Sequence, residues 1–311
     1  MTAMPPRTRR ARGDRRGPAR PAAGKPKTAG RPKSAPILNS IVWLASYPKS
    51  GNTWTRIFLA NYLLNARQPV PINQVHRIGI GDSVPGAYRM VAGGHYDPAD
   101  YLAHLRLRDR VLRGVVNNGA GMNFLKTHNA RLRVQGTELI PAKYTRCAIY
   151  MLRDPLDVTV SYARHYGITT AETVQRLSRP DNGIAADASS VGHYLGGWSD
   201  HVRGWIESRD FPVHAMRYED MKQAPHEAFA KMLSFLGIPV DDERLDRAVR
   251  FSSFDEMRRQ ESETPFTERS PHAERFFHSG ETGQWQDSVA PEDAETLRRD
   301  HGELMAKFGY L

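Results

Sequence analysis

The sequence predicts one α/β domain with a central, mostly parallel sheet flanked by helices. Two apolar runs, 41–45 (IVWLA) and 147–152 (CAIYML), have the near-continuous hydrophobicity of strands that are buried on both faces. After each run, apolar residues recur at helical spacing. Strands that alternate with helices form parallel sheets, and ligands bind beyond the carboxyl ends of such strands. Functional side chains are therefore expected where the strands end.

The positive charge of the chain is concentrated at its N-terminus. Residues 1–36 contain eleven Lys or Arg, seven Pro and a single acid, Asp14, which gives this segment a net charge of +10. The remaining residues carry 33 basic and 33 acidic side chains (44 less 11, and 34 less 1). A segment with almost no large apolar residues cannot bury a core. We therefore expect residues 1–36 to be a disordered basic tail and residues 37–311 to be the folded domain.

The composition also excludes some classes of protein. No apolar run approaches the roughly 18 residues of a membrane span, and no signal-peptide core is visible. Cys147 is the single cysteine, which excludes an internal disulfide. The chain is expected to be cytoplasmic. The basic tail leaves open a solubilising role, a targeting role and contact with nucleic acid or another anionic surface.

A phosphate-binding loop follows the first strand. The segment 47–54 (YPKSGNTW) interrupts the apolar run and supplies Lys49, hydroxyl groups and a row of backbone N–H groups before helical spacing resumes. A loop that contains glycine and leads into a helix binds anions, because free N–H groups and the positive end of the helix dipole face the same point. Lys49 precedes Gly51, whereas the lysine of a Walker A motif follows the second glycine. The loop is P-loop-like without being a Walker A loop.

This segment closely resembles the 5′-phosphosulfate loop of the sulfotransferase family, Y-P-K-S-G-T-T-W, with Asn52 in place of one threonine. The resemblance implies a single P-loop-like α/β domain that uses 3′-phosphoadenosine 5′-phosphosulfate (PAPS) as sulfuryl donor and requires no metal. It further implies that Lys49 stabilises the leaving 5′-phosphate and that Trp54 stacks on the adenine. The residues implied to bind the 5′-phosphate are Ser50, Gly51, Asn52 and Thr53.

A second motif ends the strand expected near residues 123–128. Lys126, Thr127 and His128 resemble the K-[ST]-H triplet of cytosolic sulfotransferases, whose histidine is the catalytic base. The resemblance implies that His128 takes the proton of the acceptor and that Lys126 neutralises charge on the transferring group. A base for this step must titrate near neutrality and lie within reach of the acceptor proton.

A third motif follows the apolar run 147–152. Asp154 is a good N-cap and Pro155 a good first helical residue, and Ser161 comes about two turns into the helix. Alone, Arg153 at the end of a strand would most simply form a salt bridge. The arrangement resembles the 3′-phosphate motif of the family, which implies that Arg153 and Ser161 hold that phosphate. A guanidinium group suits a terminal phosphate.

Two later segments resemble motifs that surround the adenine in the family. The segment 218–221 (YEDM) resembles Y-E-D-[ML], which implies that Tyr218 lies near the adenine. The segment 251–257 (FSSFDEM) resembles T-S-F-x-x-M, which implies that Ser252 and Phe254 pack on the base.

The last motif departs from the family. The segment 280–285 (GETGQW) resembles G-x-x-G-[DQ]-W, and the resemblance places residues 278–280 at the 3′-phosphate: His278, Ser279 and Gly280. The family usually has arginine and lysine before the glycine, and here His278 and Ser279 stand in their place. Either one cation is missing from the 3′-phosphate site, or Arg269 or Arg275 reaches it by another path.

The other elements follow from periodicity and end signals. We expect helices between Pro98 and Gly114, over 194–206 with Trp198 and Trp205 in the core, over 228–236, and from about Glu292 to Lys307, a strand over 213–217, and a mobile loop over 169–188.

Two other function classes remain open from the residues. A nucleotide or small-molecule kinase would share the strand–loop–helix unit but would need an acidic Mg²⁺ site. A nucleic-acid-binding protein would depend on the tail alone, because the rest of the chain carries no net charge. The sulfotransferase interpretation implies a small-molecule acceptor with a hydroxyl or amine. The sequence does not identify that acceptor, and it is compatible with a homo-oligomer.

Overall fold

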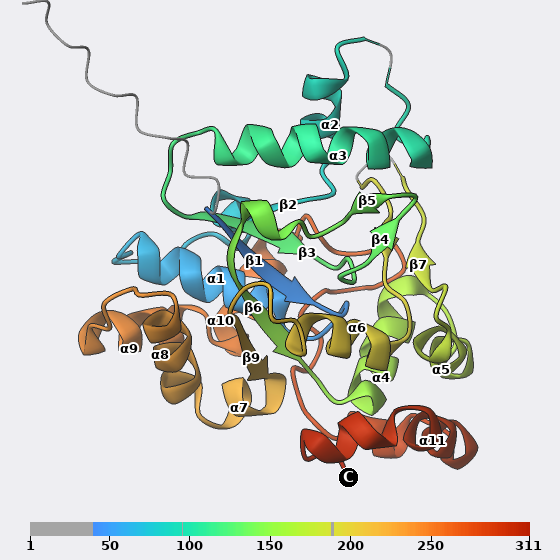
Figure 1. The fold of residues 1–311 in the computed structure, drawn as a ribbon. Helices are drawn as coiled ribbons and strands as arrows, with labels where there is room; N and C mark the ends of the chain where they lie inside the picture. The colour runs from blue at the N-terminus through green and yellow to red at the C-terminus, as the bar shows by residue number, and fades with distance from the viewer. Residues whose placement is uncertain (1–39, 95, 188–189) are drawn as a thin grey trace, which may run out of the picture. The chain divides into compact units, whose positions relative to one another are not determined.

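The structure of the protein is a computed structural model that describes residues 40–94, 96–187 and 190–311. Its central sheet has the strand order β2-β3-β1-β6-β9, and all four neighbouring pairs are parallel (Figure 1). The predicted fold class is therefore confirmed. The proposed tail lies outside the described residues. The strands of the sheet are β1 (Ile41–Ser46), β2 (Ile80–Gly81), β3 (Asn123–Thr127), β6 (Thr145–Leu152) and β9 (Val213–Arg217).

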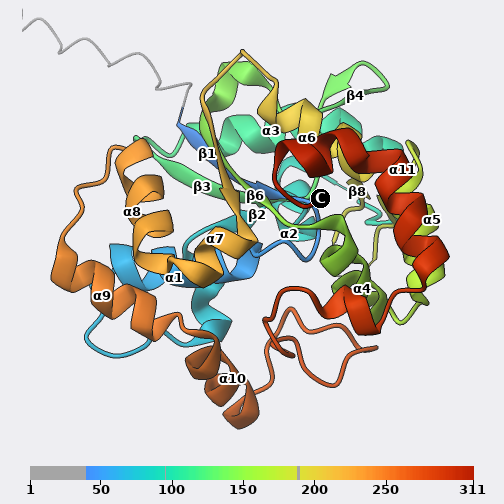
Figure 2. The same cartoon turned by 90° about the horizontal axis from the view of Figure 1, so that it is seen from below.

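Helices cover both faces of this sheet (Figures 1 and 2). Among the described residues, no helix is long and apolar enough to cross a lipid bilayer. The α-helices are α1 (Asn52–Leu63), α2 (Pro85–Ala92), α3 (Tyr101–Val116), α4 (Pro155–Tyr166), α5 (Thr170–Ser178), α6 (Trp198–Ile206), α7 (Tyr218–Gln223), α8 (Pro225–Phe235), α9 (Asp242–Phe251), α10 (Phe254–Glu263) and α11 (Pro291–Lys307). The smaller elements are the 3₁₀ helices η1 (Ile72–Arg77), η2 (Ala142–Tyr144) and η3 (Gln284–Asp287) and the hairpins β4–β5 (Arg133–Val134, Thr137–Glu138) and β7–β8 (Gly183–Ile184, His193–Tyr194).

Alternate residues of β1 face opposite helical layers, as the two-residue period of a strand requires. Trp43 and Ala45 belong to one core, which also includes residues of α3, α4, α5, α6 and α11. Val42 and Leu44 belong to a second core with residues of α1, α8 and α9. Figure 2 shows α8 and α9 beside α1, and α11 beside α5. Because β1 is buried on both faces, its continuous apolar run is explained.

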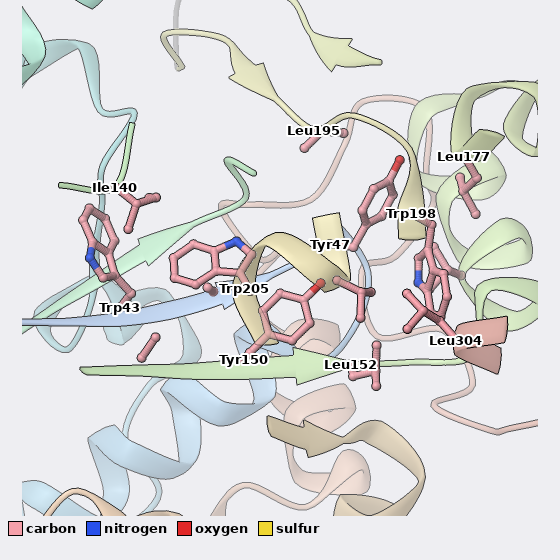
Figure 3. Packing of buried hydrophobic residues seen from close by; sticks show 14 of the residues in the cluster. Trp43, Tyr47, Ile140, Tyr150, Leu152, Leu177, Leu195, Trp198, Trp205 and Leu304 are labelled. Atoms are coloured by element: carbon pink, nitrogen blue, oxygen red, sulfur yellow. The ribbon is translucent and has the colours of Figure 1, made fainter. Parts of the chain in front are cut away.

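The aromatic residues of the first core surround the middle of the sheet (Figure 3). Trp198 and Trp205 of α6 are fully buried, which confirms that they are core residues. Buried indole N–H groups need acceptors. The Nε1 atom of Trp43 donates to Oγ1 of Thr145 at 2.9 Å, and Nε1 of Trp205 donates to the backbone oxygen of Asn129 at 3.1 Å. The second bond ties α6 to the residue that follows His128.

The prediction of a loop over 169–188 is wrong, because α5 occupies its first half. Thr169 and Glu172 form a capping box, in which each side chain bonds to the backbone of the other. Val174 and Leu177 lie one turn apart and are buried. The helix thus depends on a narrow apolar stripe and a cap, which the polar composition of the segment concealed.

The poorly patterned segment 70–122 adds the edge strand β2 and the helices α2 and α3 (Figure 1). The helix expected between Pro98 and Gly114 is confirmed as α3, which begins after the N-cap Asp100. Arg108 of α3 reaches the loop after β2, where its Nη2 atom lies 2.6 Å from Oδ2 of Asp82. The same oxygen accepts hydrogen bonds from Thr127 and Asn129. This fully buried ion pair therefore holds the residues on either side of His128.

Candidate active site

One cavity opens at the carboxyl ends of β1, β3, β6 and β9. It brings together fourteen of the sixteen site residues expected from the sequence, and the two exceptions are Ser50 and Ser252. The expected residues that line it are Lys49, Gly51, Asn52, Thr53, Trp54, Lys126, His128, Arg153, Ser161, Tyr218, Phe254, His278, Ser279 and Gly280. Segments as distant as β1 and the residues before η3 thus meet at one site.

The loop between β1 and α1 has a constrained backbone. Lys49 has a φ of 70° and Gly51 a φ of 100°, both in the left-handed region. A Cβ atom on Gly51 would lie 3.0 Å from the ring of Tyr218. Asn52 donates from Nδ2 to the backbone oxygen of Leu44 at 2.8 Å, which holds the start of α1 against β1. The first-turn N–H groups of α1 therefore face the cavity at a fixed position.

Lys49 lies in the cavity without an anionic partner among the described residues. Its Nζ atom is 3.5 Å from Nδ1 of His165 on α4 and 4.0 Å from the ring centroid of Phe276. Burial, together with the neighbouring charges of Arg153 and Lys126, lowers the pKa of Lys49 to about 7. A bound anion would restore the charge on this lysine.

Lys126 belongs to a charged cluster with Arg56 and Glu268. Glu268 accepts from both terminal nitrogens of Arg56, at 2.9 and 2.6 Å, and from Nζ of Lys126 at 3.3 Å. Although burial opposes it, the charges of Lys126 and Arg56 hold the pKa of Glu268 well below its usual range. Burial lowers the pKa of Lys126. No sequence motif pointed to Glu268, because this residue lies in an irregular segment.

His128 follows β3 and is fixed from both sides. Its Nδ1 atom lies 2.9 Å from the backbone oxygen of Ser46, to which it donates, so Nε2 is left with the lone pair. Its own backbone oxygen accepts from Nε2 of His201 at 3.1 Å, and Nδ1 of His201 lies 2.8 Å from the hydroxyl of Tyr150. Burial lowers the pKa of His128 well below its ordinary value, and the charges of Lys126 and His193 add to this. The imidazole is therefore neutral at pH 7.

Arg153 connects the phosphate loop to the segment before η3. Its Nη1 atom donates to the backbone oxygen of Lys49 at 3.3 Å, and its Nη2 atom donates to that of Glu281 at 2.9 Å. The guanidinium lies 4.3 Å from the ring centroid of Tyr218. Its Nε atom is buried without a partner among the described residues. Arg153 thus has both structural contacts and unused hydrogen-bonding capacity toward the cavity.

An aromatic wall completes the cavity. The rings of Trp54 and Tyr218 meet edge to face, with centroids 5.7 Å apart. The hydroxyl of Tyr218 donates to the backbone oxygen of Gly280 at 2.9 Å. Gly280 has a φ of 67°, and a Cβ atom there would lie 2.5 Å from the ring of Phe254. These residues form a tight apolar slot of the kind that accepts a flat ring.

The two remaining predicted residues, Ser50 and Ser252, do not line the cavity. Ser252 is fully buried and donates from Oγ to the backbone oxygen of Ala248 at 2.7 Å, within α9. The Oγ atom of Ser50 is buried without a partner among the described residues. Arg269, one of the two nearby cations, donates to the backbone oxygens of Ala273 and Glu274 and does not line the cavity.

Other residues of the cavity were not expected from the sequence. They include Arg164 and His165 of α4 and Phe276 and Phe277 before η3. The helical spacing from Ser161 was the only signal that could have pointed to Arg164. Within the described residues, no group of three or more His, Cys, Asp or Glu could hold a metal ion.

Comparisons with known proteins agree with this geometry. A profile of the family described as "Sulfotransferase domain" matches residues 39–309. The sulfotransferase 1 family member D1 of Mus musculus is 27% identical over 282 residues, covering 85% of this chain and 83% of that protein. An amine sulfotransferase of Oryctolagus cuniculus is 24% identical over 279 residues, covering 88% and 83%.

Solved structures share the fold. A mouse sulfotransferase crystallised with PAP aligns with a TM-score of 0.56 and 20% identity, over 88% of this chain and 89% of that chain. A retinol dehydratase in complex with retinol and PAP aligns with a TM-score of 0.56 and 18% identity, over 87% and 81%. Since the family profile matches most of the chain, this protein belongs to the sulfotransferase domain family and is a sulfotransferase.

Proposed function

We propose that the enzyme moves the sulfuryl group of PAPS to a hydroxyl or amine of a small-molecule acceptor, with His128 as the base and Lys49 on the leaving phosphate. The observation that carries this proposal is the position of His128, whose Nε2 lone pair shares one cavity with Lys49 and Lys126. A base for the acceptor and cations for the transferring group are the two requirements of the reaction.

The residues of the cavity fit the donor nucleotide. Lys49, Arg153 and the N–H groups that begin α1 supply positive charge and hydrogen-bond donors, and the slot beside Trp54 and Tyr218 suits a base. Buried polar atoms without partners support a polar ligand here, because such atoms are rare in native proteins. Two of them, on residues that line the cavity, are Nε of Arg153 and Nε1 of Trp54.

In the proposed reaction, the acceptor oxygen or nitrogen forms a bond to sulfur while its proton passes to Nε2 of His128. The bond between sulfur and the bridging oxygen of the 5′-phosphate breaks, and the electron pair leaves with the nucleotide 3′,5′-adenosine bisphosphate (PAP). Lys49 stabilises that oxygen, and Lys126 offsets charge on the sulfuryl group. The neutral imidazole of His128 is in the protonation state that a base requires.

A second cavity, of about 310 Å³, is lined by His193 and suits the acceptor. The ring centroid of His193 lies 5.7 Å from that of His128, which lines the first cavity. The wall combines phenol rings with aliphatic side chains, as small organic ligands prefer. The residues that form this wall include Tyr88, Tyr101, Tyr194, Leu105, Leu139 and Val191. Amine and retinol appear in the names of the relatives, which supports an amine or hydroxyl acceptor.

Two measurements test the proposal. The purified chain, mixed with ³⁵S-labelled PAPS and a panel of phenols, alcohols, amines and sugars, should form a labelled product without added metal. PAP alone should raise the melting temperature, because a ligand that binds only the native state stabilises it. A shift with ATP and Mg²⁺ but none with PAP would instead favour the kinase class.

A further inference from the structure

The site for the 3′-phosphate lacks a cation at residue 278. His278 is only partly desolvated, and this partial desolvation together with the charges of Arg164, Arg275 and Arg258 lowers its pKa. A neutral imidazole at pH 7 gives little charge to a phosphate dianion. The remaining assigned groups are Arg153, which has backbone acceptors already, and the uncharged Ser161, Ser279 and Gly280.

Arg164 lies one turn beyond Ser161 on α4, and both residues line the donor cavity. The helix begins with Asp154 as N-cap and Pro155 in its first turn, so it is a rigid base for side chains that follow it. Ser161 and Arg164 lie on α4, and Arg153 lies just before the N-cap of this helix. All three residues are therefore held by one helix and the junction that precedes it.

Arg164 has no hydrogen bond or ion pair with any residue that the structure describes, although it is half-buried. Arg164 and Arg153 are like charges that line the same cavity, and burial together with the charge of Arg153 lowers the pKa of Arg164. Such a pair is unfavourable until an anion binds between or beside the two groups. The unpaired guanidinium of Arg164 does not stabilise the fold through an ion pair, and its position in the proposed nucleotide cavity is better explained by contact with a bound phosphate.

We propose that Arg164 is the second cation that recognises the 3′-phosphate, acting with Arg153 and Ser161 in place of residue 278. This inference rests on the proposed function, since it assigns a residue to the donor that the enzyme uses. It makes Arg164 a binding residue that determines specificity for the 3′-phosphorylated nucleotide.

The other two arginines near His278 are less suited to this role, and Arg258 does not line the cavity. Arg275 lines the cavity, but its side chain is 46% exposed and its Nη2 atom lies 3.5 Å from a carboxylate oxygen of Glu274. It also comes from an irregular segment rather than from a helix. Arg275 is therefore the matched control, a nearby arginine that lines the same cavity and already has a partner.

The experiment measures the affinity of Arg164→Gln and Arg275→Gln for PAP and for adenosine 5′-phosphate by titration calorimetry without metal. Removing a charged hydrogen-bonding partner of a phosphate typically weakens binding by about ten- to a hundred-fold. We expect Arg164→Gln to lose roughly that factor for PAP and less than about two-fold for adenosine 5′-phosphate. Arg275→Gln should change both affinities by less than about three-fold, and Arg164→Lys should retain more of the preference than Arg164→Gln.

The wild type and Arg153→Ala separate the possible failures. If the wild type does not prefer PAP over adenosine 5′-phosphate, the proposed function itself fails. A second outcome is that the wild type has that preference, Arg153→Ala loses it, and Arg164→Gln keeps it. In that case only the proposed role of Arg164 is overturned. Equal losses for both nucleotides in Arg164→Gln, with an unchanged circular dichroism spectrum, would likewise overturn it.

Discussion

The Nδ1 atom of His128 lies 2.9 Å from the backbone oxygen of Ser46, so the last residue of β1 fixes the imidazole that follows β3. The phosphate loop begins directly after Ser46. Because β1 and β3 are adjacent parallel strands, one backbone carbonyl sets the spacing between the proposed base and the loop that carries Lys49. The tautomer of His128 and the position of the donor phosphate are therefore determined together.

We expect His128→Ala to lower turnover by roughly 10²–10⁴-fold, the usual contribution of a general base. Binding of PAP should stay nearly unchanged, since the alanine removes no group from the phosphate loop. Steady-state kinetics with an acceptor found in the panel, together with PAP calorimetry, measures the two effects separately. Unchanged turnover would assign His128 a structural role.

The affinity for PAP should fall as the pH rises from 7 to 9. The pKa of Lys49 in the free enzyme is about 7, and only its protonated form attracts the 5′-phosphate. The affinity for PAP is therefore highest below this pKa and declines above it, by up to about tenfold per pH unit. The decline ends above the pKa that Lys49 has in the complex, where the lysine is neutral in both states. The phosphate itself is fully ionised above pH 7 and does not oppose the trend.

The control for this pH dependence is Lys49→Arg, whose guanidinium stays charged across the range. Calorimetry at pH 6.5 to 9 should give a flatter profile for this variant than for the wild type. A wild-type affinity that does not change over this range would contradict the role of Lys49 as the charge on the leaving phosphate.

Gly280→Ala should weaken PAP binding, whereas Gly237→Ala should not. Gly280 and Gly237 have φ values of 67° and 70°, so both substitutions carry a left-handed backbone penalty of about 1 kcal/mol. A Cβ atom added at Gly280 would lie 2.5 Å from the ring of Phe254. A Cβ atom added at Gly237 would have no atom within 4 Å apart from its chain neighbours. Urea denaturation and calorimetry on both variants would check this, and equal PAP affinities would show that the slot yields to the extra methyl.

Asp82→Ala should destabilise the fold by roughly 3–5 kcal/mol, because it leaves Arg108 buried without its partner. The same change removes the acceptor for Thr127 and Asn129, which flank His128. Urea denaturation measures the free energy of unfolding. The exposed pair Arg259–Glu263 provides the comparison, since Glu263→Ala should change that energy by about 0.5 kcal/mol or less. Similar losses for both variants would contradict a special role for the buried pair.

The sequence predicted the parallel sheet and most of the expected residues that line the cavity, because these depend on local signals. The apolar runs, the cap at Asp154 and the ordered motifs each lie within a few residues of one another. Glu268 and Phe276 could not be found in this way, because their contacts with Lys126 and Lys49 join an irregular segment to strands more than a hundred residues earlier. The helix α5 was missed for a different reason, since its apolar stripe contains only two large residues.

Position 278, where the family usually has arginine and this chain has histidine, shows what a sequence motif cannot predict. The sequence correctly marked the position as a departure from the family, but a motif cannot indicate which residue of another element takes over a charge. Arg164 lies on α4 and becomes a candidate only when the cavity joins that helix to the segment before η3.

The edge strand β2 has a consequence for how this enzyme could change. Its two residues pair with β3 alone, so the remaining four strands, which carry the donor-binding groups, do not depend on it for their order. The segment that supplies α2, α3 and one side of the second cavity is joined to the rest of the fold through this short edge, through the hydrogen bonds of Asp82 with Thr127 and Asn129, and through the residues of α3 in the first core. A replacement of this segment that keeps Asp82 and the core residues of α3 should therefore alter the choice of acceptor while the order of the other four strands stays the same.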